Sequence, residues 1–279
     1  MLRVMSYNVR YFGHQNPVKG ARSTRRGLAD IAEAVAGLPE LPHVVGLQEV
    51  EARSMRSGRS HTPGEREETQ LGSLTRLLNH RLQQRRRAHR YAALYFPAHA
   101  YGVGKLAVYT TGLAVLVRDD VGFESSGPVR EVTFRRSHPL ARFKQSRICA
   151  HLRVRAPDLS TIDVFNTHLS LPQFFSSRML NGKGKGRMGW GQNQLAEVRA
   201  LAEFVHEQKS SERFVVFGDF NAQPGSPAYE EVVGRLAVRD VVSELTGVHE
   251  EELKRQWPSA GFFNLRMRLD HLFLGAGLA

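Results

Sequence analysis

A short apolar segment that ends in polar residues near position 218 constrains this chain more than any other feature. Residues 214–217 read Phe-Val-Val-Phe and are followed by Gly218, Asp219, Phe220 and Asn221. Such a run predicts a buried strand, and polar side chains just past a strand often lie in a functional site. If the backbone stays extended, Asp219 and Asn221 share a face. A surface turn also uses Gly, Asp and Asn, so this segment alone leaves both interpretations open.

The same pattern recurs along the chain. The other apolar segments are residues 2–5, 44–47, 162–165 and 269–274. The polar side chains that follow or interrupt them include Asn8, Glu49, Asn166, His168 and Asp270. Several strands that each deliver an acid, an amide or an imidazole predict a site collected at one sheet edge. We expect these side chains to line one basin that holds a cation and a phosphate.

Five motifs, in this order, resemble the endonuclease/exonuclease/phosphatase superfamily. They are SYNVR at 6–10, LQEV at 47–50, NTHLS at 166–170, GDFN at 218–221 and RLDHLF at 268–273, and they span nearly the whole chain. The superfamily includes exonuclease III-like and DNase I-like nucleases, neutral sphingomyelinases and inositol phosphatases. The resemblance implies an α+β fold, a four-layered αββα sandwich of two packed, mainly antiparallel sheets flanked by helices.

Length and periodicity agree with one domain over residues 1–279. Apolar spacing predicts helices at residues 24–37, 71–82 and 192–208. It predicts strands near residues 2–8, 43–48, 91–96, 112–118, 147–154, 161–167 and 214–217, and a surface loop at 51–68. Without the resemblance, this pattern indicates only an α/β or α+β protein.

The sequence contains no long apolar block and no secretory leader, so we expect a cytoplasmic protein. The only cysteine, Cys149, excludes an internal disulfide and suits a reducing compartment. Cys149 lies in an apolar alternation, which favours a packing role over a nucleophilic one.

The formal net charge of +12 favours a polyanionic partner, either nucleic acid or anionic phospholipid. One basic block follows the leucine-rich helix and comprises Arg81, Arg85, Arg86, Arg87 and Arg90. It serves either a polyanion or the helix end, where cations are favoured by the macrodipole. A second block at residues 181–187 alternates glycine with lysine or arginine and predicts a loop, either over the substrate or a plain insertion.

Phosphodiester cleavage builds negative charge on the phosphoryl group, and a divalent cation neutralises that charge. Mg²⁺, for which Mn²⁺ can substitute, prefers one or two carboxylates plus waters, so Glu49 is the expected ligand. The resemblance implies that Asn8 adds its amide oxygen or orients a metal-bound water. It also implies that Asp219 holds the attacking water or a second metal, and that Asn221 donates to the scissile phosphate.

His168 matches the phosphate-contacting histidine of the family and would, if protonated, stabilise the transition state. In the family, the aspartate matching Asp270 orients a general-base histidine in a later Ser-Asp-His segment, which this sequence does not contain. His271 is no replacement, because adjacent strand residues face opposite sides of the sheet. We therefore expect a fragment that lacks the final strand, with no imidazole partner for Asp270 from His138, His168 or His271.

The sequence thus predicts a Mg²⁺-dependent phosphodiesterase, and the basic charge favours a nuclease. Two alternatives stay open. One is a phospholipid or inositol phosphate hydrolase, for which the short apolar segment 171–175 is the best candidate contact. The other is an inactive nucleic-acid-binding relative, which the missing histidine permits. Substrate, endo or exo cleavage and oligomeric state are set by loops and surfaces that the motifs do not describe.

Overall fold

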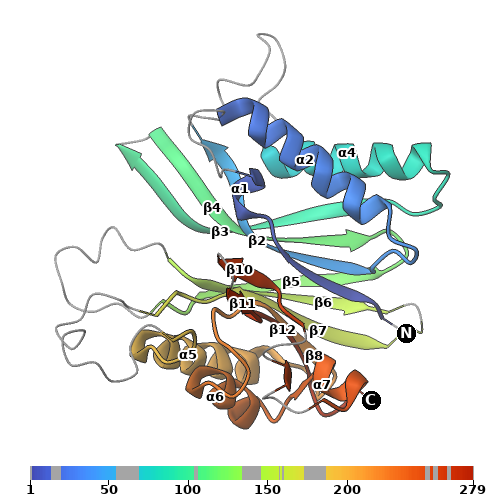
Figure 1. The fold of residues 1–279 in the computed structure, drawn as a ribbon. Coiled ribbons are helices and arrows are strands. Elements are labelled where there is room, and N and C mark those ends of the chain that lie inside the picture. The colour runs from blue at the N-terminus through green and yellow to red at the C-terminus, as the bar shows by residue number, and fades with distance from the viewer. Residues whose placement is uncertain are drawn as a thin grey trace. The chain divides into compact units, whose positions relative to one another are not determined.

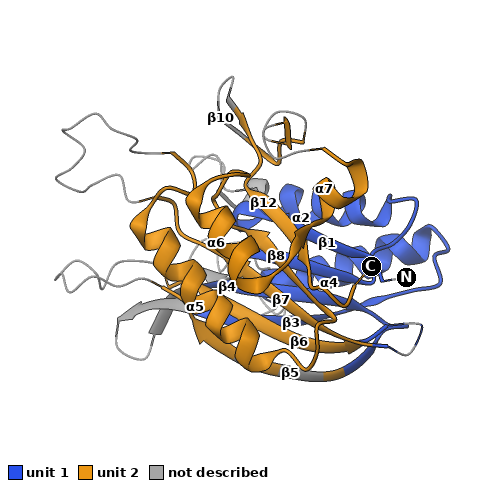
Figure 2. Ribbon diagram, turned by 90° about the horizontal axis from the view of Figure 1, so that it is seen from below, with its two compact units in different colours: residues 1–123, 155–160 blue, residues 124–154, 161–279 orange. Residues whose placement is uncertain are grey.

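The structure is a computed structural model, and it describes residues 2–13, 20–54, 69–103, 106–133, 146–156, 158, 160–172, 187–248, 252–253, 257–262 and 265–278. The chain divides into two compact units (Figure 2). Unit 1 contains residues 1–123 and 155–160, and unit 2 contains residues 124–154 and 161–279. Each unit combines one main sheet with its own helices and its own apolar core.

Unit 1 is built on a four-stranded sheet with the order β1-β2-β4-β3. Its strands are β1 (Val4–Asn8), β2 (Val44–Ser54), β3 (Tyr91–Val103) and β4 (Leu106–Arg118). Strand β1 pairs in parallel with β2, and the other two pairings are antiparallel. The helical segments are α1 (Arg10–Gly13), α2 (Gly20–Ala36) and α4 (Gln70–Gln84), and the two long helices cover one face of the sheet (Figure 1).

The sequence explains why α4 forms where it does. Thr69 caps its first turn, because the Thr69 hydroxyl oxygen accepts a hydrogen bond of 3.1 Å from the backbone N–H of Gly72. Leucines at helical spacing are buried against the sheet, namely Leu71, Leu74, Leu78 and Leu82. Their burial is the main source of stability for a helix of this length.

Unit 2 is built on a six-stranded sheet with the order β5-β6-β7-β8-β12-β9. Its strands are β5 (Gly122–Glu131), β6 (Ile148–Arg155), β7 (Thr161–His168), β8 (Phe214–Asp219), β9 (Arg239–Asp240) and β12 (Asp270–Leu274). Strands β7 and β8 are parallel, whereas β12 runs antiparallel to both β8 and β9.

The helices of unit 2 are α5 (Gln192–Gln208), α6 (Pro227–Leu236) and the short α7 (Val241–Thr246). The first two lie against one face of the six-stranded sheet (Figure 1) and bury an aromatic core that includes Phe165, Phe204 and Phe214. A separate antiparallel pair, β10 (Ala260–Phe262) and β11 (Leu265–Met267), precedes β12.

The expected α+β class is confirmed, since two mixed sheets are each flanked by helices. Residues 51–54, expected in a loop, instead continue β2, and the rest of that expected loop lies outside the described residues. Two other sequence expectations, on the Gly/Lys block and on His138, also fall largely or wholly outside them. Among the helices that the structure describes, none is both long and apolar enough to cross a bilayer.

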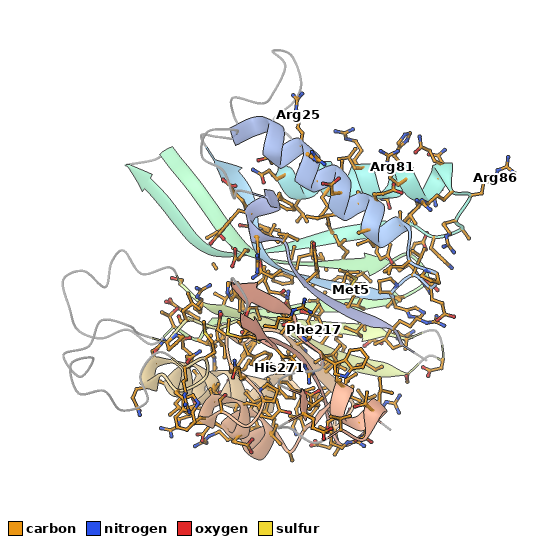
Figure 3. All side chains as sticks on the ribbon, viewed as in Figure 1. Met5, Arg25, Arg81, Arg86, Phe217 and His271 are labelled. Atoms are coloured by element: carbon orange, nitrogen blue, oxygen red, sulfur yellow. The ribbon has the colours of Figure 1, made fainter. Side chains whose placement is uncertain are left out.

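The arginine block at the end of α4 is mostly used inside unit 1. Arg81 and Arg85 both pair with Glu33 of α2, and Nη2 of Arg87 donates to the carbonyl of Leu38 at 2.8 Å. Arg86 projects outward from the helix end (Figure 3). These arginines therefore have partners within unit 1, and contact of the block with a polyanion stays a prediction.

Cys149 is fully buried, and burial raises the pKa of its thiol well above the ordinary value. A thiol that stays protonated is a poor nucleophile, so the expected packing role fits the structure.

Candidate functional site

In unit 1, Asn8 and Glu49 meet at the ends of two paired strands. Asn8 closes β1, and its register partner Gln48 precedes Glu49 in β2. The Nδ2 of Asn8 donates to Oε1 of Glu49 at 3.1 Å, while Oδ1 of Asn8 accepts from the backbone N–H of Arg10 at 2.9 Å. Both ends of the amide are engaged, so Asn8 holds the Glu49 carboxylate in a fixed orientation.

The backbone around this pair departs from regular structure. The β2–β4 register shifts between Leu47 and Val50, and Glu49 has a φ of 55°. A bulge re-aims a side chain relative to the rest of its strand, which leaves Glu49 partly exposed between buried neighbours. The turn after Asn8 is also left-handed, with positive φ at Arg10, Tyr11 and Phe12. Such conformations cost about 1–3 kcal/mol each and persist where the surrounding structure imposes them.

In unit 2, three of the predicted site residues form one row across neighbouring strands. His168 at the end of β7 is in register with Asp219 at the end of β8, and Asp219 is in register with Asp270 of β12. Residues in register on adjacent strands project to the same face of the sheet. The Nε2 of His168 lies 3.7 Å from Oδ2 of Asp219, and these two side chains are 8% and 12% exposed.

Arg147, which sequence analysis did not single out, contacts the imidazole of His168. Its Nη1 lies 2.9 Å from Nδ1 of the imidazole. The same Nη1 lies 3.3 Å from Nε2, so the guanidinium, which only donates, can donate to either ring nitrogen, with Nδ1 the nearer. Burial, and secondarily the charge of Arg147, lower the pKa of His168 well below its ordinary value. This direction favours a neutral imidazole, and the expected contact of His168 with a phosphate stays a prediction.

The GDFN segment makes a turn rather than continuing as a strand. Oδ1 of Asp219 accepts from the backbone N–H of Asn221 at 3.0 Å, and Asn221 has a φ of 49°. The premise of an extended backbone is thus wrong, although Asp219 and Asn221 are both buried. Gly218 is required for close packing, because a Cβ there would lie 1.9 Å from the carbonyl oxygen of Thr167.

Asn221 is directed back toward the end of β7. Its Nδ2 donates to the carbonyl of Leu169 at 2.9 Å and lies 3.5 Å from Nε2 of His168. In this structure Asn221 fixes the segment after His168, and its expected contact with a phosphate stays a prediction.

Gln194, near the start of α5, connects the loops that carry these residues. Its Nε2 donates to the carbonyls of Asn221 at 2.8 Å and Ser170 at 3.0 Å. Its Oε1 accepts from the backbone N–H groups of Gly189 and Gly191. A fully buried amide that satisfies four backbone groups is a strong positional constraint.

His271 faces away from the row that contains Asp270, as strand alternation predicts. Its Nδ1 lies 3.3 Å from Oδ2 of Asp240, and its Nε2 lies 2.7 Å from the carbonyl oxygen of Ala222. The ring packs among Phe220, Tyr229 and Phe273. His271 is therefore a core residue of unit 2 (Figure 3), and the expectation that Asp270 has no imidazole partner stays a prediction.

The donor chemistry of the unit 1 pair fits a divalent cation. Glu49 offers a partly exposed carboxylate, and Asn8 is a neutral neighbour that orients it. Mg²⁺ and Mn²⁺ prefer such hard oxygen donors and retain several waters when bound through one or two carboxylates.

Comparison with known proteins places this geometry in a family. The sequence profile of the Endonuclease/Exonuclease/phosphatase family matches residues 5–279. No curated protein matches the chain by sequence search. The similar solved structures have low identity and therefore show a shared fold.

Three of these structures illustrate the range. The catalytic domain of human Nocturnin with a bound sulfate is 14% identical, with a TM-score of 0.56 over 99% of this chain and 82% of that one. A mannosyl-6-phosphatase from Bacteroides thetaiotaomicron is 17% identical, with a TM-score of 0.58 over 99% and 86%. ANGEL2, a 2′,3′-cyclic phosphatase, is 18% identical, with a TM-score of 0.54 over 99% and 83%.

Members of the matched family are phosphoester hydrolases and generally depend on a divalent metal. The profile match spans nearly all 279 residues. The chain belongs to the Endonuclease/Exonuclease/phosphatase family.

Proposed function

We propose that this protein is a divalent-metal-dependent phosphodiesterase that cleaves nucleic acid. The observation that carries the proposal is the buried cluster of unit 2, where a guanidinium, a neutral imidazole and a carboxylate adjoin one another. A phosphate ester needs a cation and hydrogen-bond donors for its non-bridging oxygens, and a base for the attacking water. The cluster contains each of these groups.

In the proposed reaction, Asp219 accepts a proton from the attacking water. Its Oδ1 already receives a hydrogen bond from the backbone of Asn221, which fixes the carboxylate and leaves Oδ2 toward His168. A positioned carboxylate of this kind contributes about 10²–10⁴-fold to a proton-transfer step.

His168 and Arg147 serve the phosphoryl oxygens. In the proposed reaction Arg147 donates to Nδ1, the nearer ring nitrogen, and the imidazole donates from Nε2. The positive charge comes from the guanidinium of Arg147. The pair supplies a charge and a donor without needing a protonated histidine.

Glu49, oriented by Asn8, would hold the metal, which when bound neutralises charge on the phosphoryl group and on the leaving oxygen. The family match includes the residues of both units, which supports roles for this pair and for the unit 2 cluster in the same activity.

The choice of nucleic acid is supported by the net charge of +12, which attracts polyanions over a long range. The named relatives act on different phosphate esters, including a sugar phosphate and a cyclic phosphate, so the fold alone does not select a substrate.

The direct test measures cleavage of plasmid and of single-stranded oligonucleotides by the purified protein with Mg²⁺. Asp219→Asn keeps the side-chain shape but removes the base, and it is expected to lower kcat about a thousandfold. Asp30→Asn, on the exposed face of α2, is the matched control and should retain full activity. Equal cleavage by wild type and Asp219→Asn would reject the proposal.

A further inference from the structure

Both tryptophans of the chain are exposed, which is unusual for the largest apolar side chain. Trp190 is 48% exposed and Trp257 is 52% exposed. Tryptophan is normally among the most buried side chains on average, and an exposed one often marks a binding surface. The neighbours of Trp190, Gly189 and Gly191, are hydrogen-bonded to Gln194, which also bonds the carbonyls of Ser170 and Asn221 in the segments that follow His168 and Asp219.

The backbone on both sides of Trp190 is fixed to the site. The N–H groups of Gly189 and Gly191 donate to Oε1 of Gln194, whose Nε2 donates to the carbonyl of Asn221. Gly189 also accepts from the N–H of Ala228 at 3.0 Å. Trp190 is thus held by one shared side chain that also holds Asn221.

The turn that carries Trp190 is tightly packed. Gly189 has a φ of 92°, and a Cβ there would lie 2.0 Å from Oγ of Ser226. No other residue type fits this position without displacing the loop. The tryptophan therefore sits on a rigid base rather than on an adaptable loop.

The turn that carries Trp190 begins at an arginine and adjoins a segment with an exposed leucine. A Cβ at Gly191 would lie 3.0 Å from the Cα of Pro172, so the turn adjoins the segment that follows His168. Leu171 in that segment is 48% exposed. The exposed Arg187 closes the same turn, because its carbonyl accepts from the N–H of Trp190 at 3.1 Å.

We propose that Trp190 is a stacking platform for a nucleobase next to the scissile phosphate, so that the substrate is single-stranded nucleic acid. This inference rests on the proposed function of the same site. Every base presents a π-face to an indole, and a nearby arginine meets the phosphate that follows. A base inside a duplex is already stacked on its neighbours, so only an unpaired base is available to Trp190.

The geometry favours a base over a lipid surface. Segments that enter a membrane present several apolar side chains together, with basic residues on the opposite face. Here the structure shows one exposed indole on a turn that packs against Pro172, the residue after the exposed Leu171, with Arg187 at the start of the same turn. A preorganised single ring suits stacking, because little conformational entropy is lost when the base binds.

The first experiment uses fluorescence in EDTA, so that no substrate is cleaved. Trp257→Phe makes Trp190 the only tryptophan, and titration with a ten-residue oligothymidylate should quench its emission. The same oligonucleotide with abasic sites throughout should not quench it. Absence of quenching by both, or a blue shift only with phosphatidylcholine/phosphatidylserine vesicles, would overturn the proposal, the latter in favour of a lipid substrate.

The second experiment compares kcat/KM with Mg²⁺. Trp190→Ala should lower it about 5- to 150-fold on the base-bearing oligonucleotide. The same variant should have no effect on an oligonucleotide that is abasic on both sides of the cleaved bond. Trp190→Phe keeps a stacking ring, so its kcat/KM should fall less than that of Trp190→Ala. Trp257→Ala is the matched control for loss of an exposed tryptophan.

The two proposals fail in different ways. If the wild type cleaves no phosphate ester, the proposed function fails. Fluorescence quenching by the base-bearing oligonucleotide then still shows whether Trp190 stacks on a base. If the wild type cleaves and Trp190→Ala has equal kcat/KM on base-bearing and abasic substrates, the stacking site fails and the hydrolase stands.

Discussion

The Asn8–Glu49 pair of unit 1 and the His168 cluster of unit 2 are built in opposite ways. The side chains of the first pair are partly exposed, and its carboxylate sits on a strained backbone with a φ of 55°. In the second, His168, Asp219 and Asn221 are only 5–8% exposed and are tied together by hydrogen bonds. The buried cluster is preorganised before substrate arrives, whereas the Glu49 carboxylate is oriented by one neighbour, Asn8, and stays accessible to a ligand.

From this contrast we expect substitution of Glu49 to cause the largest loss of activity. Glu49→Gln should lower activity about a thousandfold at limiting Mg²⁺, because the charge that retains the ion is lost and metal binding supplies several kcal/mol to the transition state. Activity is measured across a Mg²⁺ titration, together with Mn²⁺ binding followed by electron paramagnetic resonance. Asn8→Ala should shift the same titration by a smaller factor of about 10–100, as expected for a group that orients a ligand.

Glu230→Gln on α6 is the matched control for this prediction. Glu230 is exposed, and it should change neither the titration nor Mn²⁺ binding. If Glu49→Gln binds Mn²⁺ as tightly as wild type, Glu49 is not the metal ligand. The Asn8–Glu49 pair would then not be a metal site that differs in function from the His168 cluster.

Substitution of Arg147 tests whether the His168 cluster of unit 2 is preorganised. Arg147→Met should lower kcat about a hundredfold, because it removes one donor and a partly buried charge from the proposed phosphoryl site. Arg147→Lys should recover part of this loss, since a lysine restores the charge but not the planar geometry. The tautomer of His168, read by ¹⁵N nuclear magnetic resonance, should become mixed in Arg147→Met. An unchanged Nε2–H tautomer would show that Arg147 does not set the ring state.

The predictable part of the site comes from residues that end an apolar strand. Asn8, His168 and Asp219 each close a strand, so periodicity alone places them at strand ends. The row from His168 to Asp270 then follows from strand pairing, which the family resemblance implies and single-sequence periodicity does not. The fold class could likewise be predicted because the family resemblance implies it.

The unpredicted part depends on tertiary context. Arg147 contacts His168 because β6 and β7 are neighbours in the sheet. The one sequence signal for this contact was the short connection at residues 156–160. A connection of that length favours a hairpin, which brings Arg147 next to the end of β7. The positive φ values of Glu49 and Asn221 reflect a bulge and a turn. Such backbone conformations are imposed by packing, and neither residue type favours them enough to reveal them.

Asp163 lies at the opposite end of β7 from His168. It has several hydrogen-bond partners, but we expect it to contribute to stability and not to catalysis. Burial opposes its ionisation, but hydrogen bonds from His151, Ser210 and Arg153 outweigh burial and lower the pKa of Asp163 to about 2. Asp163→Asn should therefore reduce the free energy of unfolding at pH 7 by about 2 kcal/mol, measured by urea denaturation. Activity per folded molecule should not change, and a loss of kcat would place Asp163 in the reaction.

The pH dependence of Asp163 has a definite sign. Because its folded pKa lies below its unfolded value, its contribution is complete above the unfolded pKa and is lost as the pH falls toward 2. Wild type should thus lose stability in this acid range more steeply than Asp163→Asn. Equal slopes would mean that the carboxylate is not stabilised by its partners.

The smallest expected effect concerns His168 and tests whether the imidazole is neutral. Burial first, and Arg147 second, lower its folded pKa below 6.5. Between the two pKa values the unfolded chain binds more protons, so the free energy of unfolding should rise with pH up to about 6.5, by at most about 1.4 kcal/mol per pH unit. Subtracting the curve of His168→Gln, measured in EDTA, removes the contributions of the other histidines. Because burial is the larger cause, Arg147→Met should keep most of this slope. A protonated His168 held by an acidic partner would give the opposite sign, with stability falling as the pH rises, and the phosphoryl charge would then come from the imidazolium instead of Arg147.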